Sequence, residues 1–233
     1  MKKEIILFDL DGTLTDPMEG ITRSVQYALR RYGIEEEDLE KLIPFIGPPL
    51  RESFMRYYGF SEEQAGEAVW VYREYFAKKG IFENRELPGI REMLAALKAE
   101  GKKLYVATSK PELYARQILK HFNLDSYFCF IGGADMEETR VKKGDVIRYV
   151  LEHAGIGGRE ETEGNPEEAF LREQAVMAGD REHDILGAAE NGISSIGVLM
   201  GYGSREELLS AGADRIAENV EDLTEFLLAD WDD

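Results

Sequence analysis

Cysteine is almost absent from the sequence: Cys129 is the only one among 233 residues, so no internal disulfide can form. It lies in the apolar run 127–131 (Tyr-Phe-Cys-Phe-Ile), which predicts a buried core thiol rather than a nucleophile. No stretch approaches the length needed to span a bilayer. The apolar run after the basic start, residues 5–8, is too short for the core of a signal peptide. The sequence therefore predicts a cytoplasmic protein without a membrane partner.

Positive charge is also scarce. The 28 lysines and arginines are outnumbered by 46 aspartates and glutamates, which gives a net charge of −18. Binding to a nucleic-acid backbone needs clustered lysine and arginine, so this balance argues against a nucleic-acid partner. Apolar residues, in contrast, are plentiful at 43%, and the length suits one large domain or a domain that carries an insertion.

Five short apolar runs, each the size of a strand and without polar alternation, indicate parallel strands covered on both faces. They are residues 5–8, 104–107, 127–131, 175–178 and 196–199. Segments with helical spacing lie between most of them, at 88–100, 111–122, 146–151 and 185–191. This alternation of strands and helices predicts an α/β fold with a doubly wound parallel sheet.

The interval between the first two strands breaks the alternation. Residues 16–86 have helical spacing and no convincing strand, and a connection of this length is too long for a loop. We therefore expect an inserted all-helical domain at 16–86, carried by a core of residues 1–15 and 87–233. A polar, turn-rich stretch at 157–168 predicts a surface loop.

Polar residues gather where the predicted strands end. Asp9 and Asp11 follow the first strand, Thr-Ser-Lys at 108–110 follows the second, and Asp180 follows the fourth. Ligands of open α/β sheets bind at the carboxyl ends of the strands, so these side chains should meet at one edge. Carboxylates repel one another unless a cation neutralises them, and oxygen ligands without histidine or cysteine suit Mg²⁺. A carboxylate can also act as a nucleophile and form an aspartyl-phosphate.

Four motifs resemble those of the haloacid dehalogenase superfamily, in the same order along the chain. They are Asp-Leu-Asp-Gly-Thr at 9–13, Val-Ala-Thr-Ser-Lys-Pro at 106–111, a lysine near Lys143, and Gly-Asp-Arg-Glu-His-Asp at 179–184. The resemblance covers nearly the whole chain. It implies a Rossmann-like core with a helical cap, and a phosphatase that depends on Mg²⁺.

The resemblance also implies roles for individual residues. Asp9 resembles the nucleophile and a metal ligand. Asp11 resembles the acid that protonates the leaving alkoxide and then deprotonates the attacking water, and its backbone carbonyl would bind the metal. Because this second aspartate is present, phosphoryl transfer is favoured over hydrolysis of a carbon–halogen bond. Thr108 and the amide of Ser109 would hold the phosphoryl oxygens.

The remaining metal and charge assignments follow from the later motifs. Asp180 resembles a metal-binding carboxylate, with Asp184 contacting the metal through water or orienting its neighbours. The spacing to the following helix favours Lys143 as the motif lysine, while Lys142 and Lys110 remain alternatives.

The insertion occupies the place of the mobile cap in the phosphoglycolate phosphatase-like and 5′-nucleotidase-like branch of the superfamily, and a cap selects the leaving group. Arg23 and the Phe-Ile-Gly-Pro-Pro-Leu-Arg segment at 45–51 are candidates for substrate contact. The expected substrate is a small phosphate ester, a nucleoside monophosphate ahead of phosphoglycolate. Alternatives are a phosphomutase that acts on sugar phosphates and a non-catalytic phospho-sensor. The expected assembly is a monomer or a homodimer.

Overall fold

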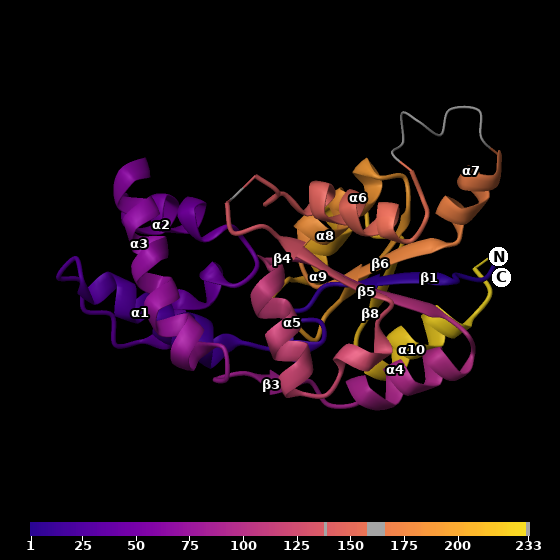
Figure 1. Cartoon of the computed structure of the whole chain (residues 1–233), viewed down its shortest axis with the longest axis horizontal. Helices are drawn as coiled ribbons and strands as arrows, with labels where there is room; N and C mark the ends of the chain where they lie inside the picture. Colours follow the sequence, from indigo (N-terminus) through magenta and orange to yellow (C-terminus); the bar gives the residue numbers. More distant parts are fainter. Residues whose placement is uncertain (138, 158–165, 232–233) are drawn as a thin grey trace. The chain divides into compact units, whose positions relative to one another are not determined.

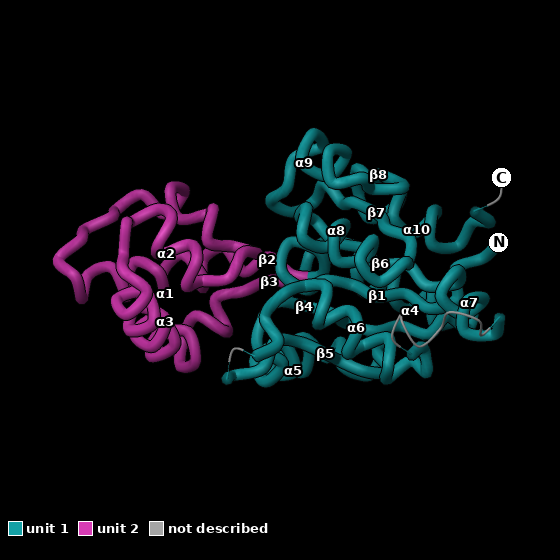
Figure 2. Tube along the Cα trace, turned by 90° about the horizontal axis from the view of Figure 1, so that it is seen from above, with its two compact units in different colours: residues 1–14, 86–233 teal, residues 15–85 magenta. Residues whose placement is uncertain are grey.

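The computed structural model describes residues 1–137, 139–157 and 166–231 of the chain. The chain divides into two compact units, which are coloured separately in Figure 2. Unit 1 consists of residues 1–14 and 86–233, and unit 2 of residues 15–85. The boundaries expected from the sequence, after residues 15 and 86, each lie one residue further along the chain.

Unit 1 is built around a six-stranded sheet with the strand order β5-β4-β1-β6-β7-β8. Its strands are β1 (Ile5–Phe8), β4 (Lys103–Pro111), β5 (Phe130–Ala134), β6 (Ala175–Gly179), β7 (Ser194–Val198) and β8 (Arg215–Ala217). All neighbouring strands pair in parallel, and Phe8 of β1 lies level with Val106 of β4 and Ala178 of β6. The carboxyl end of β1 is therefore flanked on both sides by the corresponding ends of its neighbours.

Helices cover both faces of this sheet (Figure 1). On one face, α6 (Lys143–His153) and α8 (Glu182–Glu190) pack on β1, β4 and β6 through a buried cluster that includes Leu7, Tyr105 and Met177. On the other face lie α4 (Ile90–Ala99), α5 (Glu112–His121) and α10 (Val220–Leu228). The remaining elements are α7 (Pro166–Glu173), α9 (Arg205–Ser210) and the 3-10 turn η3 (Asp125–Tyr127). The predicted doubly wound α/β core is confirmed.

The third predicted strand begins later than its apolar run suggests. Residues Asp125–Tyr127 form η3, and β5 starts only at Phe130, so the strand predicted at 127–131 was misplaced. Cys129 consequently precedes the strand and is exposed, and the prediction of a buried thiol was wrong. Strand β8 was not predicted, because its three residues carry no apolar run.

The loop expected at 157–168 overlaps the start of a helix. Residues 158–165 lie outside the described residues, while residues 166–168 form the first turn of α7, contrary to the expectation of a loop. Within the described ranges, no helix is both long enough and apolar enough to cross a bilayer.

Unit 2 is helical, and its elements are α1 (Met18–Arg30), the 3-10 turn η1 (Leu39–Phe45), α2 (Leu50–Tyr58), α3 (Glu62–Tyr75) and the π-helical turn η2 (Phe76–Gly80). Phe45, Phe54 and Phe76 are almost fully buried in its core. A two-stranded ribbon of β2 (Thr15–Asp16) and β3 (Arg85–Glu86) joins its ends at the boundary with unit 1. Neither strand is predicted by the sequence, because two residues are too few to leave a periodic pattern.

Candidate active site

The site begins where β1 ends. Asp9 follows Phe8 directly, and its backbone N–H donates to the carbonyl of Ala178 at 2.9 Å, so β6 still holds this residue. The chain then turns at Gly12, which has a φ of +82°, and an added Cβ would lie 2.3 Å from Asp180 Oδ2. Both the left-handed backbone and the neighbouring carboxylate therefore require glycine at this turn.

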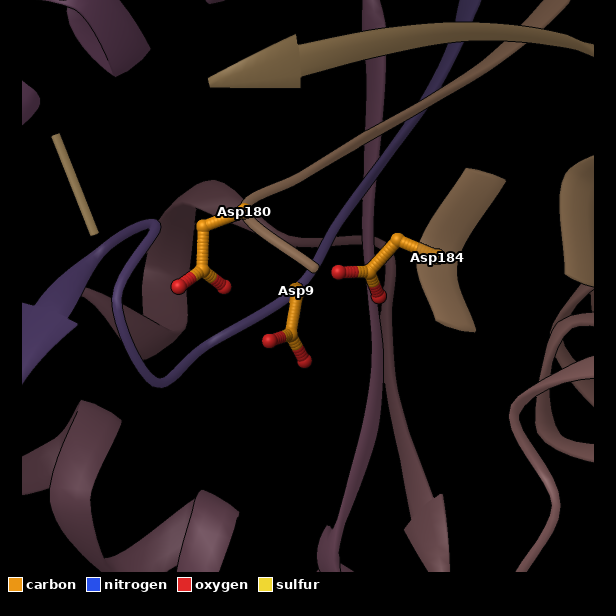
Figure 3. A group of neighbouring side chains, drawn as sticks. All are labelled: Asp9, Asp180 and Asp184. Carbon is orange, nitrogen blue, oxygen red and sulfur yellow. The ribbon is translucent and has the colours of Figure 1, made fainter. Parts of the chain in front are cut away.

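Three buried carboxylates converge beside this turn (Figure 3). Asp9 comes from the end of β1, Asp180 from the end of β6 and Asp184 from the first turn of α8, and each offers an oxygen within 4.8 Å of the others. Asp184 Oδ2 accepts the N–H of Arg181 at 3.1 Å, which fixes this carboxylate at the start of its helix. Gly179 leaves room for it, since an added Cβ would lie 2.2 Å from Asp184 Cγ.

Lys143 is the lysine that reaches this group. Its Nζ donates to Asp9 Oδ1 at 2.7 Å and to the Ala107 carbonyl at 3.0 Å, and it lies 2.8 Å from Asp184 Oδ1. Burial lowers the pKa of Lys143, but the charges of Asp184 and Asp9 outweigh it, so the net shift is upward and the ammonium stays charged. Lys142, the neighbouring alternative, is exposed.

Lys110 makes a separate buried pair. Its Nζ lies 2.8 Å from Asp11 Oδ2, and both side chains are 10% exposed or less. Burial raises the pKa of Asp11, and the charge of Lys110 partly opposes this shift. Lys143, which the sequence favoured, therefore lies at Asp9, and the alternative Lys110 lies at Asp11.

Of the three carboxylates, Asp180 is the one whose buried negative charge is least offset by its partners. Burial, followed by the charges of Asp184 and Asp9, raises its pKa well above the ordinary value. Its Oδ2 accepts the N–H of Tyr202 at 2.7 Å, but its buried Oδ1 has no hydrogen-bond partner among the described residues. Such an oxygen calls for an explanation. A hard divalent cation supplies one, because the donors that converge here are carboxylate oxygens without histidine or cysteine.

Asp184 shares this environment. Its pKa is raised to about 6 by burial, with Lys143 opposing the shift and Asp9 adding to it. Asp184 is thus one of the three converging carboxylates, whereas the side chain of Asp11, expected to act as the acid, pairs with Lys110. The Asp11 backbone carbonyl, the atom that the motif resemblance assigns to the metal, is not engaged by that side-chain pair.

Thr108 and Ser109 lie at the end of β4, next to β1. Thr108 is 2% exposed, and its Oγ1 accepts the backbone N–H of Lys110 at 3.2 Å. The ladder between β4 and β5 shifts register between Thr108 and Pro111, so Ser109 and Lys110 stand outside regular pairing. The backbone of Ser109 and Lys110 therefore does not take part in the regular pairing with β5.

Arg23 belongs to unit 2, and its described partners also belong to that unit. Its guanidinium pairs with Glu19 at 2.7 Å and with Glu83 at 2.8 Å, and its side chain is 43% exposed. Glu83 also accepts the hydroxyl of Tyr75 at 3.0 Å. The two ion pairs thus orient the Arg23 guanidinium within unit 2.

The loop after β7 was missed by the sequence analysis. An added Cβ at Gly201 would lie 2.2 Å from Asp180 Oδ2, and one at Gly203 would lie 1.9 Å from the Asp180 carbonyl. The N–H of Tyr202 between them binds the same carboxylate. The available signal was the Gly-Tyr-Gly sequence just beyond a strand, at the edge where the other motifs end.

The chain is similar to known proteins in sequence and in fold. A model of the family described as haloacid dehalogenase-like hydrolase matches residues 6–198. A 5′-nucleotidase of Pseudomonas aeruginosa is 51% identical over 203 residues, which cover 87% of this chain and 86% of the relative. The tyrosine-protein kinase PtkA of Mycobacterium tuberculosis is 38% identical over 200 residues, which cover 86% of this chain and 63% of that protein. The crystal structure of a predicted phosphatase from Clostridium acetobutylicum has a TM-score of 0.87 and 46% identity, over 97% of this chain and 98% of the other.

The chain belongs to the haloacid dehalogenase-like hydrolase family, since the family model matches well over half of it. Within this family it is a phosphatase, that is, a phosphoric monoester hydrolase. The family and the enzyme class expected from the four motifs are confirmed.

Proposed function

We propose that the chain is a Mg²⁺-dependent phosphatase that hydrolyses a small phosphate monoester and that Asp9 takes the phosphoryl group as an aspartyl-phosphate. The observation that carries the proposal is the setting of Asp9. Its buried carboxylate lies 2.7 Å from the Lys143 ammonium, beside two further carboxylates suited to a cation. An anionic nucleophile can meet an anionic phosphate only where their charge is neutralised, and this arrangement supports such neutralisation.

The first step forms a bond between an Asp9 carboxylate oxygen and phosphorus while the bond from phosphorus to the leaving oxygen breaks. The Asp11 carboxyl gives its proton to the leaving alkoxide. This role needs a protonated acid, and burial raises the pKa of Asp11 in that direction. In the second step, the ionised Asp11 accepts a proton from the water that attacks phosphorus. Phosphate leaves, and Asp9 and Asp11 return to their starting states.

Lys143, the Thr108 hydroxyl and the Ser109 amide are assigned to the phosphoryl oxygens. The Thr108 oxygen accepts a hydrogen bond from the Lys110 backbone, which leaves its own hydrogen to donate to the substrate. Lys143 supplies a fixed positive charge, since its raised pKa keeps the ammonium protonated.

We assign Asp9, Asp180 and the backbone carbonyl of Asp11 to the metal, with Asp184 contacting it through water or orienting its neighbours. The unpartnered buried oxygen of Asp180 and the convergence of three carboxylates support this assignment. When bound there, Mg²⁺ supplies neutralisation of the charge on the transferring phosphoryl oxygens.

Unit 2 is proposed to be the cap that selects the leaving group, with Arg23 and the 45–51 segment as candidate contacts. The ion pairs of Arg23 with Glu19 and Glu83 support this role, because a held guanidinium discriminates better between substrates than a mobile one. The 51% identity to a protein named 5′-nucleotidase favours a nucleoside monophosphate. Phosphoglycolate is second, since the relative named phosphoglycolate phosphatase 1 is 26% identical.

The test is release of inorganic phosphate from a panel of nucleoside monophosphates, sugar phosphates, pyrophosphate and phosphoglycolate, with Mg²⁺ or with EDTA. We expect turnover of a nucleoside monophosphate that requires Mg²⁺ and is absent in Asp9→Asn. Wild-type rates in that variant would remove Asp9 as the nucleophile.

The same panel separates the alternatives. A phosphomutase would accumulate the isomeric sugar phosphate without free phosphate. A non-catalytic phospho-sensor would retain a long-lived aspartyl-phosphate and release almost none. The similarity to PtkA adds a third alternative, phosphoryl transfer from ATP to a protein tyrosine. Such a kinase would label a protein substrate instead of releasing phosphate.

A further inference from the structure

We infer that Asn191 is a positioning residue for the active-site lysine. It ties the first turn of α6 to the end of α8 and thereby holds Lys143 Nζ between Asp9 and Asp184. The inference rests on the proposed function, in which Lys143 balances charge at the phosphoryl group, and it adds a residue that does not touch the substrate.

Lys143 needs such support because it is the first residue of α6. The residue before it, Lys142, makes no side-chain capping bond to the helix. Helix ends without a cap fray, and a side chain on a fraying turn moves with its backbone. Phosphoryl transfer is sensitive to displacements of about 1 Å in the groups that contact the phosphate, so the position of this turn matters for the rate.

Asn191 supplies the missing tie. It is 3% exposed, and its Nδ2 donates to the Gly144 carbonyl at 2.9 Å and to the Gly187 carbonyl at 2.8 Å. The bond to Gly187 lies within the last turn of α8. The bond to Gly144 reaches α6 at the residue that follows Lys143. The side-chain amide therefore joins the two helices at the point where the lysine leaves the backbone.

The two helices also touch directly at this junction. An added Cβ at Gly187 would lie 3.0 Å from Gly144 N and 3.1 Å from Lys143 Cγ. An added Cβ at Gly144 would lie 1.9 Å from Glu190 Oε2. Because the two glycines leave no room for a further side chain, the helices are closely packed here, and a shift at the end of α8 passes to the start of α6.

Arg172 also holds Asn191, through its backbone carbonyl. This arginine of α7 is 8% exposed and donates through Nη1 to the Asn191 carbonyl and through Nη2 to the Gly157 carbonyl. A buried guanidinium needs such partners to offset its loss of hydration. The contacts thus run without a gap from Arg172 through Asn191 and Gly144 to Lys143.

The test is a double-mutant cycle on the Mg²⁺-loaded enzyme, with the best substrate of the panel and at a temperature well below the unfolding midpoint of every variant. We expect Asn191→Ala to lower kcat about tenfold and to leave KM within about twofold, because the lysine is displaced while the other proposed substrate contacts remain. In a Lys143→Met background, Asn191→Ala should change kcat by less than about twofold. The matched control is Ser195→Ala, which removes the hydrogen bond of another buried polar side chain of unit 1, from the Ser195 hydroxyl to Asp214, and should keep kcat within about twofold of wild type.

The outcomes distinguish failure of the positioning role of Asn191 from failure of the proposed role of Lys143. An equal loss from Asn191→Ala with and without Lys143, or no loss at all, overturns the positioning role. A fully active Lys143→Met enzyme overturns the role of that lysine in the proposed function, and this inference with it. If Asn191→Ala does not fold, Arg172→Met takes its place in the cycle, with an expected loss of about threefold that again disappears without Lys143.

Discussion

Replacing Asp180 by asparagine should stabilise the metal-free protein and remove its response to Mg²⁺. The Asp180 carboxylate is 1% exposed, and its Oδ1 has no hydrogen-bond partner among the described residues. Its Oδ2 accepts the N–H of Tyr202 at 2.7 Å, and the carbonyl oxygen of asparagine can accept the same bond. The substitution therefore removes a buried charge and keeps the hydrogen bond.

The size of the effect follows from two repulsions. Oxygens of Asp9 and Asp184 lie within 4.8 Å of Asp180, which at an effective dielectric constant of about 20 gives about 3.5 kcal/mol for each pair of full charges. Partial protonation reduces this value, because burial and the two neighbouring carboxylates raise the pKa of Asp180 in the folded protein. After this reduction, we expect Asp180→Asn to raise the free energy of unfolding by about 1–3 kcal/mol near pH 8.

The pH dependence has a definite sign. A carboxyl group whose pKa is raised by folding stabilises the protein at low pH, and this contribution is lost as the pH rises through the folded-state pKa. Asp184, with its pKa raised from 3.8 to about 6, gives the scale of such a contribution, about 3 kcal/mol. The gain from Asp180→Asn should accordingly be smaller near pH 5, where the wild-type carboxyl is more protonated.

The assay is urea unfolding in EDTA and in saturating Mg²⁺, with Asp125→Asn as a control that removes one exposed acidic charge from the same unit. Mg²⁺ at a hundred times its Kd should stabilise the wild type and the control by about 2.7 kcal/mol and should leave Asp180→Asn nearly unchanged. The reasoning would be refuted if Asp180→Asn were less stable than wild type in EDTA, or if Mg²⁺ stabilised it as fully as wild type.

Three further predictions concern the chemistry. Asp9→Asn should lower kcat by at least about a thousandfold, because an amide is a poor nucleophile, while the far-ultraviolet circular dichroism stays that of wild type; a loss of under tenfold would contradict it. Lys110→Met should move the alkaline limb of the pH profile of kcat/KM upward, since removing the lysine charge raises the pKa of Asp11 and the reaction needs its protonated form; a downward shift would remove Asp11 as the acid. Arg23→Ala should lower kcat/KM about tenfold for the best substrate and less than threefold for a generic aryl phosphate, and equal losses on both would exclude a role in specificity.

Much of the site could be predicted from the order of residues alone. In a parallel sheet every strand ends at the same edge, so finding the strands is enough to bring Asp9, Thr108 and Asp180 together. Apolar runs mark such strands clearly because both faces of the sheet are buried. The helical spacing of residues 16–86 likewise revealed the insertion, since that pattern depends only on local periodicity.

For the motif lysine, the spacing to the following helix favoured Lys143 but left Lys142 and Lys110 open. Lys110 lies at the end of β4, and Lys142 and Lys143 lie at the start of α6. Only the packing of α6 on α8 turns Lys143 toward Asp9. The position of α6 depends on contacts between residues more than forty positions apart, such as the bond from Asn191 to Gly144, which no periodicity reports.

The same distinction holds for the chain as a whole. The sequence by itself determined the class of fold and the edge of the sheet where the polar motifs meet, because these follow from local pattern and strand order; the proposed role of Asp9 as the nucleophile came from the motif resemblance. Only the tertiary structure decided which lysine faces Asp9, that Asp184 joins the carboxylates and that Cys129 is exposed. These features depend on side chains that meet across different elements, and their positions are set by packing between segments distant in the chain.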